Sequence, residues 1–329
     1  MLMPWQPSAT MSHLKKRAQL FSAVRAFFAE RDVMEVDTPL LCHTSVTDPA
    51  IASIPAIFRK FNESAHEGKT YYLQTSPEYA MKRMLASGSG SIYQLSKAFR
   101  QGEVGRYHNP EFMMLEWYRI GFDHHALMDD MDALLQTVLG VRRAERITYH
   151  ALFERYLHIN PHAVTLAELH RLAKQFNLEE ALYGLPKEEC LNLLMTHVIE
   201  PHLGAEVPCF IYDFPVTLAA LARIVPVGAY GNAHATASRF EVYYRGIELA
   251  NGFHELADAD EQRERFLANL RQRELLGLPA LPIDDYFLGA LQAGLPDCAG
   301  VALGFDRLVM LALGLDNIQA VLSFDFSRV

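Results

Sequence analysis

The sequence has few cysteines and no surplus of positive charge. Its 329 residues include four scattered cysteines, none in a CxxC pair, at Cys42, Cys190, Cys209 and Cys298. A reduced cytoplasm and no structural zinc site are the simplest interpretation. Lysine and arginine number 30 against 39 acidic residues, for a net charge of −9. This balance argues against a broad nucleic-acid surface, because phosphate contacts need clustered cations.

Leader and membrane signals are also missing. The opening segment MLMPWQPSAT lacks a basic region followed by an apolar stretch, so we expect no signal peptide. No uncharged apolar run reaches the length that spans a bilayer. Because 50% of the residues are hydrophobic, the chain can bury one large core. The sequence therefore predicts a soluble cytoplasmic protein without a membrane partner.

What the sequence does contain is a charged loop between two strand-like runs. Arg100 ends the first run, and the second, ending at Tyr118, alternates with a period of two. This pattern predicts two antiparallel strands. One strand face carries Phe112, Glu116 and Tyr118, and a carboxylate between aromatic rings is costly unless it binds a cation or meets water. We expect this segment to hold a charged ligand.

Capping signals place further elements before this loop. Ser12 is the predicted N-cap of a first helix, and a strand ending near Pro39 should follow it. Ser76, Pro77 and Glu78 combine a capping hydroxyl, a first-turn proline and an acid. These three residues predict the start of a second helix.

The middle of the chain differs from its two ends in the spacing of its hydrophobic residues. Helical periodicity dominates from about 124 to 237, which we interpret as a helical insertion. Strands are expected again around a tight turn at Arg245 and Gly246. A charged helix should begin at the cap Asp258 and stop at Gly277, and a small-residue strand should enter a last helix at Gly304. We predict one α+β domain over 1–329, an antiparallel sheet flanked by helices.

Three clusters that could carry chemistry occur in a fixed order. They are the hairpin at about 92–119, Glu241 with the run ELANGFHEL, and GVALGFDR within about 299–314. In this order they resemble motifs 2 and 3 of class II aminoacyl-tRNA synthetases, and about 12–42 resembles motif 1. The segments TSPE, HNPEF and MLEWY are most similar to the lysine branch. The resemblance covers nearly the whole chain and implies a class II synthetase-like catalytic domain.

The resemblance implies activation of an amino acid by ATP with Mg²⁺. Arg100 would bridge the substrate carboxylate and the α-phosphate, and Arg307 would cover the adenine face opposite Phe112. Glu241 and Glu248 match the positions that hold Mg²⁺ on the phosphates. Other positions that the resemblance places at ATP are Gln101, Gly102, Glu103, His108, Asn109, Leu249 and Gly304.

The resemblance also locates an amino-acid pocket. Its positions here are Ser76, Pro77, Glu78, Glu116, Tyr118, Asn251, Glu255 and Ala302. Several acids facing Arg100 match two ammonium groups and one carboxylate, whereas an apolar amino acid would leave those acids unpaired in a desolvated site. Lysine or a lysine isomer is therefore favoured.

Three departures from the lysine branch refine this expectation. We find no segment that could form the anticodon-binding β-barrel that precedes motif 1 in those synthetases. The resemblance is therefore nearest to stand-alone paralogues that ligate (R)-β-lysine to a lysine of translation elongation factor P. Ala302 replaces a glycine, and we hypothesise that its methyl helps to select β-lysine. The glutamate of the usual FRxE pattern would fall at Gly102, so its role passes to Glu103 or to the backbone.

Structural interpretations and rival functions stay open. Glu116 could form a buried salt bridge with Arg119 or Lys97. Glu78 could simply favour a helix N-terminus, and Phe112 and Tyr118 could be core aromatic residues. Glu241 could be a solvated strand residue. The rival functions are a minimal lysyl-tRNA synthetase that activates L-lysine for tRNA or another amine, and a catalytically silent regulator. The low cation count argues against tRNA, and a homodimer through motif 1 is expected by analogy.

Overall fold

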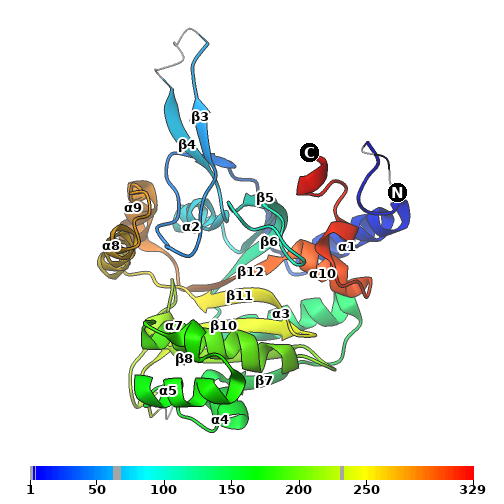
Figure 1. The fold of residues 1–329 in the computed structure, drawn as a ribbon. Coiled ribbons are helices and arrows are strands. Elements are labelled where there is room, and N and C mark those ends of the chain that lie inside the picture. The colour runs from blue at the N-terminus through cyan, green and yellow to red at the C-terminus, as the bar shows by residue number, and fades with distance from the viewer. Residues whose placement is uncertain (1–2, 4, 62–67, 230–232) are drawn as a thin grey trace. The chain divides into compact units, whose positions relative to one another are not determined.

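The computed structural model describes residues 3, 5–61, 68–229 and 233–329. The chain divides into two compact units (Figure 1). The first comprises Met1–Gly121, Ala257–Cys298 and Ala302–Val329. The second comprises Phe122–Leu256 and Ala299–Val301. Strand β12 (Cys298–Gly304) contributes residues to both units.

The first unit begins with helix α1 (Met11–Ala29), which buries Leu20, Val24, Phe27 and Phe28. Its N-cap is Thr10, whose hydroxyl accepts from the His13 amide, so the prediction of Ser12 as the cap is wrong by one half-turn. Strand β1 (Met34–Glu35) follows and pairs in parallel with β5 (Ile92–Phe99). The predicted hairpin is confirmed, since β5 pairs antiparallel with β6 (Glu111–Ile120).

The remaining elements of the first unit are short. A separate sheet has the order β2 (Leu41–Cys42), β4 (Lys69–Leu73), β3 (Pro55–Phe58). The helices are α2 (Glu78–Ala86), α8 (Ala259–Leu275), α9 (Asp285–Gly294) and α10 (Phe305–Ala312), with short 3₁₀ turns at Ile318–Val321 and Phe326–Arg328. Asp258 caps α8 as predicted, and Gly277 follows its end with a φ of +67°.

The second unit contains a sheet with the order β11 (Ile247–His254), β10 (Thr236–Tyr244), β8 (Cys209–Pro215), β7 (Glu145–Thr148), with β9 (Ile224–Val225) beside β10. Its α-helices are α3 (His124–Leu139), α4 (Tyr149–Leu157), α5 (Leu166–Ala173), α6 (Glu179–Leu182) and α7 (Lys187–Leu194). Shorter helical turns are Lys174–Phe176, Met195–Ile199, Glu200–His202 and Val216–Leu218. These helices and the sheet share one apolar core, which includes Phe153, Leu169, Leu194 and Ile211.

Two sequence expectations need correction here. The segment 124–237, predicted as a helical insertion, also contains β7, β8 and β9, so its helices were predicted and its strands were missed. The α+β class is confirmed, but the strands are not all antiparallel, because β1 with β5 and β7 with β8 pair in parallel. In the described parts of the chain, no helix combines the length and apolarity that crossing a bilayer requires.

Candidate active site

One of the predicted amino-acid-binding residues is a buried carboxylate of the first unit. Glu116, on β6, is only 2% exposed. Ser76 donates to its Oε2 at 2.7 Å, and Tyr118 donates to its Oε1 at 2.6 Å. The alternative salt bridge to Lys97 is not formed, since Lys97 pairs with Glu111 at 2.7 Å. Glu116 is thus held by hydroxyl groups, which leaves its carboxylate able to receive a further donor.

The electrostatic state of Glu116 follows from this environment. Burial and the neighbouring Glu78 raise its pKa to about 7, against the lowering effects of Tyr118, Ser76 and Lys82. Burial disfavours the charged form because the protein interior solvates it poorly. An ammonium group placed beside Glu116 would favour the charged form of this carboxyl group.

Lys82 is a residue that the sequence interpretation missed. It lies on α2, is fully buried, and its Nζ is 2.6 Å from Glu78 Oε1. Glu78, predicted as a pocket acid, is therefore paired with a lysine of its own helix. Ser76 accepts from the Glu78 amide at 3.1 Å, while Pro77 is the N-cap residue of α2. The positive charge of Lys82 therefore offsets the negative charge of Glu78.

The predicted catalytic residue Arg100 follows β5 directly. Its guanidinium lies over the Phe112 ring, with its central carbon 5.2 Å from the ring centroid. Its Nη1 is 3.5 Å from Glu103 Oε1. Its Nε is buried and has no hydrogen-bond partner within the described part of the chain. A buried donor without a partner is costly, and a substrate anion would satisfy it.

Gly102, at the position of the usual motif glutamate, has a backbone conformation that disfavours a side chain. Its φ is +83°, a left-handed conformation that residues with a Cβ rarely adopt. The backbone amide of Val104 donates to the Gly102 carbonyl at 2.9 Å, and that of Gln101 donates to the Ala52 carbonyl at 2.8 Å. Glu103, one residue later, supplies the carboxylate that faces Arg100.

The predicted adenine-side residues make protein contacts of their own. Arg307, in the first turn of α10, approaches the Tyr107 carbonyl at 3.2 Å and His108 Nε2 at 2.7 Å. Burial and the charge of Arg307 lower the pKa of His108, so its neutral ring accepts from the guanidinium. Asn109 is committed to backbone groups: its Nδ2 donates to the Glu111 carbonyl and its Oδ1 accepts from the Phe326 amide.

The start of α10 depends on an aspartate that the sequence interpretation also passed over. Asp306 is 1% exposed. It accepts from the Met113 amide at 2.7 Å and pairs with Arg17 of α1 at 2.5 Å. These contacts attach the first turn of α10, which contains Arg307, to β6 and to α1. A Cβ at Gly304, the N-cap, would only reach ordinary contact with Arg307, 3.6 Å away, so this protein's own packing does not require glycine there.

In the second unit, the predicted metal ligands share one face of β10 and β11. Arg239, Glu241 and Tyr243 alternate along β10, and Glu241 pairs directly with Asn251. The register then shifts at Val242/Tyr243, so that Tyr243 pairs with Glu248 and Leu249 becomes the extra residue of a bulge. Strict alternation would place Glu248 and Asn251 on opposite faces. The bulge brings them to the same face.

Both carboxylate oxygens of Glu241 have fixed partners. Arg239 Nη2 donates to Oε1 in a short contact. The Tyr243 hydroxyl lies 2.9 Å from Oε2 and 3.2 Å from Glu200 Oε1. Burial, then Glu241, Glu248 and Glu200, raise the pKa of Tyr243, so the phenol stays protonated and can donate. Glu241 is 8% exposed, which rules out the solvated strand residue considered from sequence.

The remaining predicted pocket residues are placed by β11 and β12. Glu255, just after β11, is 1% exposed, and its carbonyl accepts from Arg223 Nε at 2.7 Å. Ala302, on β12 in the first unit, is half-buried, and Leu249 is buried. The predicted residues therefore form two groups, one in each unit.

The donor set of Glu241 and Glu248 fits a magnesium ion. Mg²⁺ prefers oxygen ligands and is commonly held by one or two carboxylates together with waters and substrate phosphates. Each Glu241 oxygen accepts one hydrogen bond and keeps a lone pair for a cation. Among the described residues, no three His, Cys, Asp or Glu side chains converge on one metal position.

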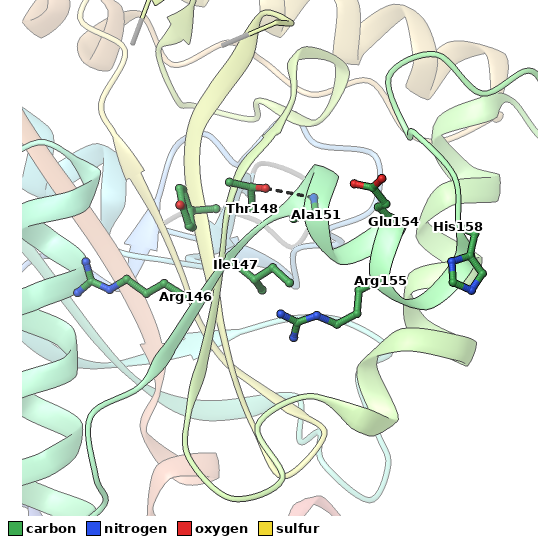
Figure 2. Close-up of a pocket in the computed structure, with 8 residues that line it drawn as sticks. Arg146, Ile147, Thr148, Ala151, Glu154, Arg155 and His158 are labelled. Atoms are coloured by element: carbon green, nitrogen blue, oxygen red, sulfur yellow. Dashed lines mark hydrogen bonds between the residues drawn. The ribbon is translucent and has the colours of Figure 1, made fainter. Parts of the chain in front are cut away.

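A cavity of about 580 Å³ in the second unit contains none of the predicted site residues (Figure 2). It is lined by Arg146, Ile147, Thr148, Ala151, Glu154, Arg155, His158 and Tyr212. Arg146 is paired with Asp129 and Arg155 with Glu145. The Thr148 hydroxyl caps α4 by accepting from Ala151. Both arginines of this cavity already form ion pairs with acidic residues, so we do not assign the ATP or amino-acid site to it.

The class of the protein follows from a family comparison. The family model for tRNA synthetases class II (D, K and N) matches residues 3–328. The chain therefore belongs to this family, whose members use ATP.

Individual members of the family are similar to this chain over nearly its whole length. A protein of Vibrio cholerae named "Elongation factor P--(R)-beta-lysine ligase" is 51% identical over 327 residues, 98% of each chain. Proteins of the same name from Vibrio parahaemolyticus and Proteus mirabilis are 50% and 48% identical over 325 residues, again 98% of each chain. The predicted fold and the predicted kinship with stand-alone synthetase paralogues are confirmed.

Proposed function

We propose that this chain activates (R)-β-lysine with ATP and transfers it to a lysine ε-amine of translation elongation factor P. The observation that carries the proposal is the identity of about half of all residues to ligases of that name, over 98% of both chains. The enzyme is an ATP-dependent ligase. Its proposed setting is the cytoplasm, and a homodimer is the proposed assembly.

The first step joins the amino acid to AMP. A carboxylate oxygen of β-lysine attacks the α-phosphorus of ATP, and the bond to the leaving pyrophosphate breaks. Arg100 is proposed to hold the attacking carboxylate and the α-phosphate together, because its buried Nε lacks a partner in the described chain and a guanidinium binds oxyanions in a fixed geometry. Mg²⁺ on Glu241 and Glu248 would neutralise phosphate charge when bound.

The second step transfers the acyl group. The acceptor ε-amine attacks the carbonyl carbon of the adenylate, AMP leaves, and the new amide nitrogen loses a proton. No covalent protein intermediate is needed, because the mixed anhydride is already activated. A cationic end of β-lysine is proposed to face Glu116 in the first unit, which is nearly fully buried. Burial favours a substrate whose charge pairs with this acid.

ATP–pyrophosphate exchange tests the proposal directly. We expect exchange with (R)-β-lysine to exceed exchange with L-lysine at equal concentrations. A preference for L-lysine together with charging of tRNA would instead make the chain a minimal lysyl-tRNA synthetase. Absence of exchange with both amino acids would refute amino-acid activation and support the regulator.

A further inference from the structure

Arg239 touches a predicted metal ligand and a predicted substrate ligand at once. From β10, its Nη2 donates to Glu241 Oε1 and its Nε donates to Asn251 Oδ1 at 3.2 Å. Glu241 and Asn251 are direct partners across β10 and β11. Arg239 lies two residues before Glu241, so its side chain extends along the same face of the sheet. One guanidinium therefore links the two kinds of ligand.

The guanidinium is itself held in place from other directions. Its Nη1 donates to the Leu218 carbonyl at 2.7 Å. Its central carbon lies 4.6 Å from the Phe214 ring centroid and 6.0 Å from that of Phe253. The side chain is 16% exposed. Three nitrogens thus donate in three directions while aromatic rings limit rotation, an arrangement that the single ammonium of lysine cannot reproduce.

We propose that Arg239 is a positioning residue that fixes the Glu241 carboxylate for the metal and the Asn251 carboxamide for the amino acid. The proposal rests on the proposed function for the identity of those two ligands. Glu241 is buried, so removing Arg239 would leave its charge without the cation that now compensates it. Asn251 would lose the donor that determines which end of its amide faces the strand pair.

Arg239 fixes its two ligands before substrate arrives. Tyr243 holds the other Glu241 oxygen, so the carboxylate is clamped from both sides. Ligands oriented by neighbouring groups bind metal more tightly, and loss of such a group costs about 10- to 100-fold in metal affinity or activity. The same guanidinium also restrains Asn251, so a single substitution should weaken both metal and amino-acid binding.

The test compares Arg239→Met and Arg239→Lys with a matched arginine control. Arg146→Met is suitable, because Arg146 (labelled in Figure 2) also lies on a strand of this unit. Its guanidinium pairs with Asp129 at 2.6 Å and lies over the Phe210 ring, 5.5 Å from the centroid. Binding of Mn²⁺ with a non-hydrolysable ATP analogue is measured by electron paramagnetic resonance. Steady-state exchange gives separate KM values for the amino acid and for ATP.

We expect Arg239→Met to weaken Mn²⁺ binding about 10- to 100-fold and to raise the amino-acid KM, with Arg239→Lys intermediate. Arg146→Met should match the wild type in both readouts. If Arg239 acts through Glu241, the double variant Arg239→Met/Glu241→Gln should bind Mn²⁺ no more weakly than Glu241→Gln alone. Multiplicative losses in the double variant, or Mn²⁺ binding by a folded Arg239→Lys and Arg239→Met equal to the wild type, would overturn the proposal.

The two proposals fail in different ways. A wild-type chain without exchange on either lysine refutes the proposed function, whereas the Mn²⁺ titrations still decide the positioning role. Normal wild-type exchange with unchanged Mn²⁺ and amino-acid constants in the Arg239 variants refutes the positioning role alone.

Discussion

Replacing Glu116 by glutamine should flatten the dependence of stability on pH. The substitution keeps the size of the side chain and removes its ability to ionise. In the folded protein the pKa of Glu116 is raised from its ordinary 4.5 to about 7, chiefly by burial and next by Glu78. The folded state therefore binds this proton more tightly than the unfolded chain does.

The sign and size of the effect follow from linkage. Because the folded pKa is the higher one, the unfolded chain ionises first as pH rises, and the stabilisation present below about 4.5 is lost by about 7. The full difference corresponds to about 3 kcal/mol, of which about 2–3 kcal/mol falls between about pH 5 and pH 8. Glutamine also leaves one of the Ser76 and Tyr118 hydroxyls to find a new acceptor, a cost of about 1–3 kcal/mol that does not vary with pH.

Urea unfolding at several pH values between about 5 and 8 measures the effect. The free energy of unfolding of Glu116→Gln, minus that of the wild type, should shift in favour of the variant by about 2–3 kcal/mol across this range. Glu30→Gln serves as the control, because that side chain is 75% exposed, and its difference from the wild type should stay nearly constant. Parallel curves for Glu116→Gln and the wild type would refute the raised pKa.

Four further predictions concern single residues. Arg100→Ala should abolish pyrophosphate exchange while the circular dichroism spectrum stays native, and normal exchange would sink the proposed role. Ala302→Gly should reduce the preference for β-lysine over L-lysine in kcat/KM, and an unchanged ratio would discard the methyl hypothesis. Gly102→Glu should lower unfolding free energy by about 1–2 kcal/mol, because φ is +83° there; a neutral result would contradict the strain argument. Lys82→Met should cost about 3 kcal/mol or more in thermal or urea unfolding, since it leaves Glu78 unpaired, and a stable variant would show that the pair is dispensable.

Local signals in the sequence predicted much of this fold. The β5–β6 hairpin followed from alternation, the cap Asp258 from its side-chain oxygen, and the turn at Arg245 and Gly246 is present with both residues at positive φ. These features depend on neighbours within a few residues. For the same reason the entry into α10 at Gly304 was predictable from small residues followed by helical periodicity.

Other features depend on contacts between distant segments, and the sequence could not reveal them. The bulge that places Glu248 on the same face as Glu241 depends on how β10 and β11 pair. The sequence around Arg239 indicates only a strand residue, and its contact with Glu241 is visible only in the structure. Lys82 has the position of a solvated helix residue, yet it is fully buried against Glu78. Strands β7 and β8 were not predicted, because they lie in a segment where helical periodicity dominates.

Transfer of labelled β-lysine tests the central claim most directly. Purified enzyme is incubated with ATP, Mg²⁺, labelled (R)-β-lysine and either elongation factor P or tRNA. We expect ATP-dependent label on a single lysine of elongation factor P, lost when that lysine is replaced by arginine, and none on tRNA. Label on tRNA, or none on the protein despite active pyrophosphate exchange, would contradict it.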